Sequence, residues 1–334
     1  MSKIRRVLNL IGRHQDKLWW FHSFYSLLLG IGVMWLGTRH FAYLRVAVFH
    51  IAFIWATSLL LPTVFTLPRL KPGWKRRIRL LINYFQRNFY QQLLFFILPI
   101  YYLSASGESL NMVFVAAIAV SALLATLDII YDRHLSLKSG LMAVFFAFNL
   151  FVCINVMLPI ILSINISLSL RISALLALTG FASYHFAQST SRPVQKLVFT
   201  AIAALFLLVI VEPGRFLIPP APLRLMEVRF GRELNRETIQ IESPFSHPPG
   251  DRPLRIFALT AIQAPLGLKD NIGHRWYLNG KLVYASPFHQ IQGGRKTGFR
   301  LWTSVRLKRA SPFSRIRLDV ETEGGQLIGR KFLE

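Results

Sequence analysis

Long apolar runs alternate with short polar or basic segments over the first two thirds of the chain. A helix needs about 20 consecutive apolar residues to cross the hydrocarbon core of a bilayer, because each residue rises about 1.5 Å. Seven segments fit: approximately Leu18 to Gly37, Val46 to Leu67, Phe89 to Ser106, Leu110 to Ile130, Leu141 to Ser163, Ile172 to Ala187 and Leu197 to Ile218. The pattern predicts a membrane all-α bundle of about seven transmembrane helices.

The longest uncharged stretch, between Ser139 and Leu170, is too long for one span and contains a polar patch. The patch consists of Ser163, Asn165, Ser167 and Arg171. We expect the chain to leave the membrane there and to start the next span at Ile172. Residues 72–89 are basic and aromatic, and they either lie on the membrane as an amphipathic helix or extend the third span.

From about Pro219 onward a period of two replaces the long apolar runs, which is typical of β-strands. The clearest element is a hairpin around Asn279-Gly280, because this pair favours a type I′ turn. Its register should place Trp276 opposite Val283 and Tyr277 opposite Leu282. Further strands are expected at Leu225 to Phe230, Thr238 to Ile241, Leu254 to Gln263, Phe288 to Gln292, Phe299 to Leu307, Ile316 to Thr322 and Leu327 to Phe332. So many short strands predict an all-β, immunoglobulin-like sandwich.

Two of these strands have clearly different faces. In Phe299 to Lys308, one face is largely apolar, and the other carries Arg300, Trp302, Ser304, Arg306 and Lys308. In Arg315 to Glu321, the apolar side chains point inward, and Arg315, Arg317, Asp319 and Glu321 should form a solvated outer face. The first strand therefore predicts a cationic surface with a tryptophan in its middle.

Composition supports a membrane protein, with 53% hydrophobic and 16% charged residues in 334 and a mean hydropathy of +0.42. The formal net charge is +24, yet the basic residues fall in short runs between apolar stretches, which argues against a nucleic-acid binder. Cys153 is the single cysteine, so a disulfide or a cysteine-based metal site within one chain is excluded.

Lys and Arg accumulate on the cytoplasmic side of membrane proteins. A cytoplasmic N-terminus puts 16 of them on that side, and only Arg39, Arg45 and Arg171 in the short loops opposite. We therefore predict a cytoplasmic basic tail over residues 1–17, a seven-span region over 18–218 and a β domain outside the cytoplasm over 219–334.

The residues from Pro265 onward carry a more specific pattern. Its elements are Pro265-Leu266-Gly267-Leu268, His274-x-Trp276, Asn279-Gly280, Gln292-Gly293-Gly294-Arg295, Gly298-Phe299-Arg300-x-Trp302-Thr303 and Gly325-Gln326-Leu327-Ile328-Gly329-Arg330. The set resembles the bacterial domain of unknown function 2914, in the version fused behind a multi-span region. Ser314-Arg315-Ile316 replaces the usual Gly-Trp pair of that family. The resemblance implies a bacterial inner-membrane protein with a periplasmic β domain, and it transfers no catalytic residue.

No motif indicates catalysis, a cofactor or a metal. His247, His274 and His289 lack short ligand spacing and are interpreted as structural. Gly293 to Gly298 lacks the spacing of a phosphate loop and is interpreted as a basic hairpin turn. Polar groups within the predicted spans are few, and His22 and His185 should be interfacial.

The most suggestive constellation is a ligand-binding face made of Trp302 with Arg300 and Arg306, adjoined by Arg275, Tyr277 and Tyr284. Aromatic faces stack on sugars, and arginines bind carboxylates or phosphates. The sequence therefore predicts a binding or scaffolding domain for an anionic envelope glycan or a membrane-protein partner, in a protein that also contacts the lipid bilayer. A membrane enzyme or transporter for envelope lipid or glycan precursors is the alternative function. In a purely structural alternative, Trp302 caps a core edge or packs on the seventh span.

Overall fold

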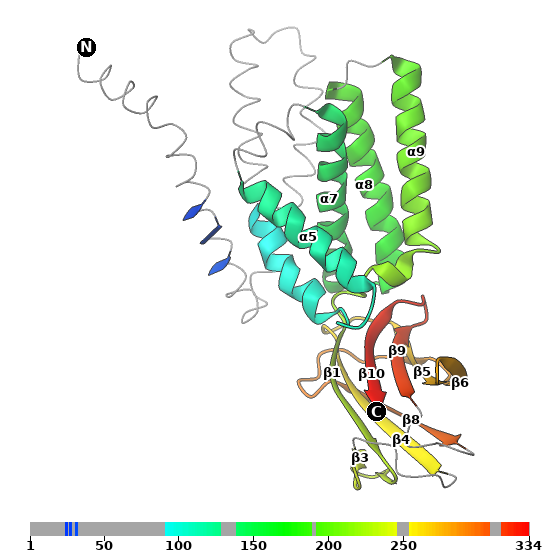
Figure 1. The fold of residues 1–334 in the computed structure, drawn as a ribbon. Helices are drawn as coiled ribbons and strands as arrows, with labels where there is room; N and C mark the ends of the chain where they lie inside the picture. The colour runs from blue at the N-terminus through cyan, green and yellow to red at the C-terminus, as the bar shows by residue number, and fades with distance from the viewer. Residues whose placement is uncertain are drawn as a thin grey trace, which may run out of the picture. The chain divides into compact units, whose positions relative to one another are not determined.

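The computed structural model describes residues 91–127, 138–188, 192–245, 254–307 and 315–333, together with 24–25, 27–28 and 31–32. Segment 72–89 and nearly all of the first two predicted spans lie outside these residues. The described chain runs from apolar helices to antiparallel strands (Figure 1).

Three described helices are long and apolar enough to cross a membrane: α7 (Ser139–Leu162), α8 (Ile166–Gln188) and α9 (Pro193–Val211). The third and fourth predicted spans contain two shorter apolar helices, Gln91–Leu103 and α5 (Asn111–Thr126). Both are shorter than the roughly 20 residues that a span requires. Among the described residues three helices thus reach spanning length, and the two shorter helices match the third and fourth predicted spans over only part of their length.

Helix α8 begins at Ile166, six residues before the predicted start at Ile172. Two side chains satisfy its first backbone N–H groups: the Leu168 N–H donates to Asn165 Oδ1 (2.7 Å), and the Ile166 N–H donates to Asp270 Oδ2 (2.9 Å). Arg171 is therefore in the second turn of a helix, and its expected place in an exit loop was wrong.

The strands form two main antiparallel sheets and no closed barrel among the described residues. The three-stranded sheet has the order β1 (Arg224–Gly231), β4 (Leu254–Gln263), β8 (Phe299–Leu307). The five-stranded sheet has the order β10 (Leu327–Leu333), β9 (Ile316–Thr322), β5 (Asn271–Leu278), β6 (Lys281–Ala285), and β7 (His289–Gln290) also pairs with β5. A small hairpin joins β2 (Leu234–Asn235) and β3 (Gln240–Ile241).

The predicted bounds of β4, β8 and β9 are confirmed. The predicted hairpin is also present, with positive φ at Asn279 and Gly280. Its register differs in one place, because a bulge sets Trp276 opposite Tyr284 rather than Val283, while Tyr277 faces Leu282 as expected.

The segment from Gly293 to Gly298 connects β7, in the five-stranded sheet, to β8, in the three-stranded sheet. The interpretation of this segment as a hairpin turn was therefore wrong, because the two strands that it joins do not pair with each other.

Both main sheets contribute to the same two apolar clusters, so they pack face to face. One cluster contains Ile262 and Leu301 from the three-stranded sheet with Ile272, Val320 and Ile328 from the other. The second contains Phe230, Ile256, Ala258, Val305 and Leu307 with Trp276, Ile316, Leu318 and Leu333. The indole N–H of the fully buried Trp276 donates to Thr303 Oγ1 (2.9 Å).

The chain divides into two compact units. The helical unit comprises Met1–Pro99, Ala116–Ile154 and Ser173–Leu208, and the β unit comprises Ile100–Val115, Asn155–Ile172 and Val209–Glu334. The β unit therefore includes the sheets and the helix ends that contact them.

Candidate functional site

The outer face of the three-stranded sheet gathers arginines around two aromatic rings. Register places Trp302 beside Leu259 and Ser304 beside Phe257, on the side opposite the apolar core. The ring centroids of Phe257 and Trp302 are 6.4 Å apart. We call this surface the cationic face and define it by Arg236, Arg255, Phe257, Arg300, Trp302 and Arg306.

The arginines of the cationic face contact neutral groups. The Arg255 guanidinium donates to Ser304 Oγ (3.0 Å) and lies 4.9 Å from the Phe257 ring centroid. Arg300 Nη1 donates to the Thr238 and Ile239 carbonyls (both 3.2 Å). The Arg236 guanidinium lies 5.6 Å from the Trp302 ring centroid.

None of the four arginines forms an ion pair with a described carboxylate. Arg306 is exposed at the end of β8, opposite Arg255 on β4. Glu227, which lines the same hollow as Arg300, is paired with Arg229 on β1. The cationic face therefore keeps an uncompensated positive charge.

A small hollow opens beside Arg300. Its lining includes Leu259 and Ala261 from β4, and Ile239 and Gln240 from the β2–β3 hairpin. The volume is about 80 Å³. Pockets for small organic ligands usually measure about 300–1,000 Å³. This geometry favours contact with an extended surface or polymer over enclosure of a small molecule.

The other three predicted site residues lie on the five-stranded sheet. Arg275 and Tyr277 are in β5, and Tyr284 is exposed in the edge strand β6. The expected adjoining of all six residues is not observed, because β5 and β8 belong to different sheets. The structure brings together Arg300, Trp302 and Arg306 and separates them from the other three.

The outer face of the five-stranded sheet is occupied by ion pairs. Arg330 holds Asp319 through two hydrogen bonds (2.7 and 2.8 Å), and Arg317 Nε lies 3.3 Å from the same carboxylate. Arg275 pairs with Glu321 (2.8 Å). We call this surface the paired face and define it by Arg275, Tyr277, Arg317, Asp319, Glu321 and Arg330.

The paired face is not the solvated surface that the alternation predicts. The Asp319 side chain is only 2% exposed, because Arg317 and Arg330 cover it. The Arg317 guanidinium lies 3.9 Å from the Tyr277 ring centroid. Burial raises the pKa of Glu321, although Arg275 opposes this shift, whereas the bond to Asp319 raises the pKa of Arg330.

Sequence reasoning missed Arg236 and Arg255. Arg255 has the same strand parity as Phe257, so the alternation in β4 could have placed it on the outer face. Only the β4–β8 register puts it beside Arg306. Arg236 gives no strand signal, because it lies in the β2–β3 turn.

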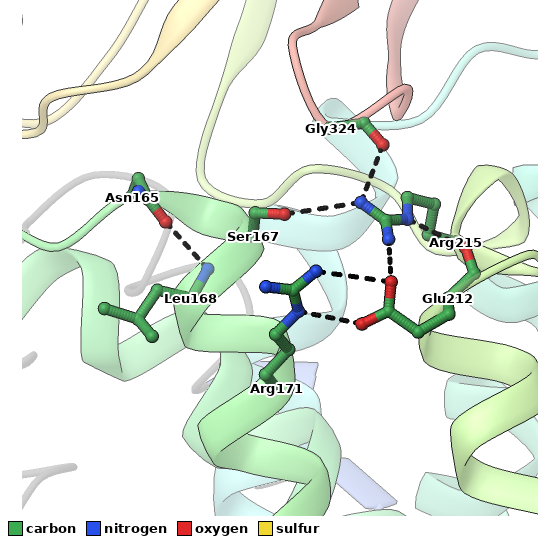
Figure 2. Close-up of polar contacts among 7 residues, drawn as sticks. All are labelled: Asn165, Ser167, Leu168, Arg171, Glu212, Arg215 and Gly324. Carbon is green, nitrogen blue, oxygen red and sulfur yellow. Dashed lines mark hydrogen bonds and ion pairs between the residues drawn. The ribbon is translucent and has the colours of Figure 1, made fainter.

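A second polar cluster joins helix ends to the sheets within the β unit (Figure 2). Arg171 from α8 forms two hydrogen bonds to Glu212, which directly follows α9. Arg215 contacts the same carboxylate and donates to Ser167 Oγ (3.4 Å) and to the Gly324 carbonyl (3.1 Å). The Arg171 bond lowers the pKa of Glu212, and the cluster attaches the β9–β10 turn to the helix ends.

Two further contacts join helix ends to β10. Asn111 Nδ2 donates to the Leu327 carbonyl (3.3 Å), and Arg330 Nη1 donates to the Glu108 carbonyl (3.1 Å). The polar cluster and these two contacts attach the helix ends to β10 and to the β9–β10 turn.

His274 lies in the core. Its Nε2 atom is 2.8 Å from the Thr260 hydroxyl, and its Nδ1 atom is 2.8 Å from the Thr303 hydroxyl. Burial lowers the pKa of His274 to about 3. Both His274 nitrogens are therefore occupied and cannot bind a metal. Of the other two predicted structural histidines, His289 is exposed, and His247 lies outside the described residues. The described residues contain no group of three or more metal-ligating side chains.

His185 lies in the last turn of α8, near the end of this apolar helix. It is 5% exposed in α8, and its ring lies 5.6 Å from that of Phe181 and 5.8 Å from that of Phe199. Elsewhere in the described helices, Ser121 Oγ donates to Asn149 Oδ1 (2.6 Å), and Asn155 Nδ2 donates to the Tyr101 hydroxyl (3.1 Å). These contacts cross-link helices by hydrogen bonds.

Apolar helices of membrane-spanning length followed by an antiparallel β domain define the class of this protein. A family model described as "Family of unknown function (DUF5924)" matches residues 1–246, and the chain belongs to that family. The match ends before Pro265, so the resemblance of the later residues to domain 2914 stays a prediction. No curated protein and no solved structure matches the chain.

Proposed function

We propose that this protein is a multi-pass inner-membrane protein whose periplasmic, immunoglobulin-like β-sandwich binds an anionic envelope component on the cationic face. The observation that carries the proposal is the group of arginines around Trp302 and Phe257 that have only neutral partners. An anionic glycan supplies the carboxylates or phosphates that these arginines lack, and its sugar rings can stack on the indole. An acidic surface of a membrane-protein partner is the second ligand of the same chemistry.

The membrane arrangement in this proposal rests on the distribution of charge. The segments are a cytoplasmic tail over residues 1–17, seven spans over 18–218 and a periplasmic domain over 219–334. Support comes from the 16 Lys and Arg on one side of the predicted spans against three on the other. A reporter that is active only after export should work when fused after Glu334, and activity of a cytoplasm-only reporter there would contradict the arrangement.

Binding is tested with the full chain in detergent and fluorescent polygalacturonate, a carboxylated sugar polymer. Trp302→Ala should weaken binding about fivefold, because an aromatic stacking contact contributes about 1 kcal/mol. Arg255→Ala and Arg306→Ala should also weaken binding and make it less sensitive to salt, since each removes a screened charge interaction.

Matched controls lie on the other sheet. Tyr284→Ala removes an exposed aromatic ring from β6, and Lys281→Ala removes one exposed positive charge from the same strand. Both should leave binding unchanged, and uncharged dextran should not bind any form of the protein. Equal losses from the Trp302 and Tyr284 variants would refute a specific role for the cationic face.

A further inference from the structure

The loop between β4 and β5 touches the ends of two helices that are long enough to span a membrane. A Cβ at Gly267 would lie 2.6 Å from Ser163 Oγ, and Ser163 directly follows Leu162, the last residue of α7. Three residues further along the loop, Asp270 accepts the hydrogen bond from Ile166, the first residue of α8. The loop therefore lies where two apolar helices end.

This loop carries the most exposed large apolar side chain of the described residues. Leu266 is 81% exposed, and it immediately precedes Gly267. Consecutive Cα atoms are about 3.8 Å apart, so Leu266 lies close to the end of α7. An apolar side chain that is exposed beside the end of an apolar helix is available for contact with lipid.

A second, basic loop packs against the first. The Gly294 N–H donates to the Ala264 carbonyl (2.9 Å), and Gly294 has a φ of 85°. A Cβ on Gly294 would lie 2.6 Å from Leu266 Cδ1, so the absence of a side chain allows this close packing. Arg295 and Lys296, which follow directly, are both exposed.

A third exposed cation, Lys269, lies in the first loop. Among the described residues, Lys269, Arg295 and Lys296 form no ion pair, and Arg295 donates only to Gln292 Oε1 (2.8 Å). The neighbouring Asp270 carboxylate is buried and accepts two backbone N–H groups. We define the loop rim as Leu266, Lys269, Arg295 and Lys296.

We propose that the loop rim is a membrane-binding surface, in which Leu266 enters the headgroup region of the bilayer and the three cations bind the phosphates of anionic phospholipids. Exposed apolar and basic side chains together favour an anionic bilayer surface, because each cation near such a surface gains electrostatic attraction. The helix ends beside the loop bring the bilayer within reach. The loop rim is separate from the cationic face and does not depend on its ligand.

Leu266→Cys followed by an environment-sensitive fluorophore tests this proposal in the full chain, reconstituted in vesicles of phosphatidylcholine and phosphatidylglycerol. Cys153 is 1% exposed, and the labelled wild-type chain measures its background. The label at 266 should be quenched several-fold more by nitroxide-labelled lipid than by aqueous iodide. Lys281→Cys at the distant hairpin is the matched control and should show the opposite preference.

Two outcomes at position 266 overturn the proposal. Quenching by iodide equal to that at position 281 would show a solvent-exposed loop, and protection from both quenchers would show that protein covers it. Lys296→Cys repeats the measurement at a second exposed position, so a defect of one variant does not decide the result.

The anionic-lipid part has its own test. Arg295→Gln with Lys296→Gln should reduce lipid quenching at position 266 several-fold in vesicles with phosphatidylglycerol and leave it unchanged in pure phosphatidylcholine. The charge-preserving pair Arg295→Lys with Lys296→Arg should retain the wild-type signal. Equal quenching of the neutral pair and the wild type in both vesicles would refute recognition of anionic lipid.

Discussion

The two outer faces of the β-sandwich both combine arginines with aromatic rings, and they differ in what the arginines contact. On the paired face, each of the three arginines forms an ion pair with Asp319 or Glu321, and the Asp319 side chain is only 2% exposed. On the cationic face, Arg255 and Arg300 contact a hydroxyl and two carbonyls, and Arg236 lies over an indole.

The difference separates arginines whose charge stabilises the fold from arginines whose charge can bind a ligand. An arginine whose carboxylate partner is buried contributes to folding, and removing either partner leaves a charge without compensation. An arginine on an exposed face with neutral partners gains more from an incoming anion. Residue type alone does not distinguish the two faces, whereas the presence or absence of a carboxylate does.

The largest expected effect is on the paired face. Asp319→Asn removes the charge that Arg317 and Arg330 share, and it should lower the free energy of unfolding by about 4 kcal/mol, because it breaks a buried ion pair. Denaturant unfolding of the full chain in detergent, followed by tryptophan fluorescence, measures the loss. A loss below about 1 kcal/mol would mean that the paired face is held by other contacts.

Acid should destabilise the core between the two faces. His274 has a pKa of about 3 in the folded state and an ordinary value of 6.5, so the unfolded chain binds the proton more readily. Stability therefore falls as pH drops below 6.5, by about 1.4 kcal/mol per pH unit and by about 3 kcal/mol at about pH 4.

His274→Gln isolates this effect. Asp270 and Glu321 have raised pKa values and act in the opposite direction, so the informative quantity is the difference in slope between the variant and the wild type. His289→Gln removes the second and smaller cause of the low His274 pKa, so it should change the slope less than His274→Gln does. A wild-type slope in the His274 variant would contradict a neutral buried imidazole.

The sequence predicts strands well where one face is apolar. It predicts less well which sheet a strand joins and which side chains cover it, because residues far along the chain determine both. Alternation defines the bounds of β8 and β9. It cannot assign a strand to a sheet, and this is why Trp302 and Tyr277 were expected to adjoin. It also cannot reveal that Arg330, on a third strand, would cover Asp319.

The helices show the same limit. Apolar length identifies α7 and α9, but the first turn of α8 is capped by the local Asn165 together with Asp270, which lies 104 residues beyond Ile166 along the chain. The spacing of apolar residues near Ser163 predicts a turn there and carries no information about the cap.

A smaller effect is expected from Trp302→Ala. The indole is partly covered by Phe257 and Arg236 on the cationic face, so its loss should lower the free energy of unfolding by about 2 kcal/mol, below the 3–5 kcal/mol of a core tryptophan. Trp276→Ala, in the core, is the matched comparison. Similar losses from both variants would make Trp302 a core residue and remove it from the binding face.

Arg306→Ala should have the smallest effect on stability, within about 0.5 kcal/mol, because the side chain is exposed and has no ion pair with a described residue. Arg330→Ala on the paired face should cost several times more. Comparable losses from the two arginines in denaturant unfolding would erase the distinction between the faces.

Chemical modification of arginines with phenylglyoxal, read by mass spectrometry on the full chain in detergent, tests the central claim most directly because it reports on both faces at once. Without ligand, Arg236, Arg255 and Arg306 should react faster than Arg317 and Arg330. Polygalacturonate should slow the reaction of the first three and leave the other two unchanged. Protection confined to the paired face, or no protection on the cationic face when the polymer is bound, would contradict the account.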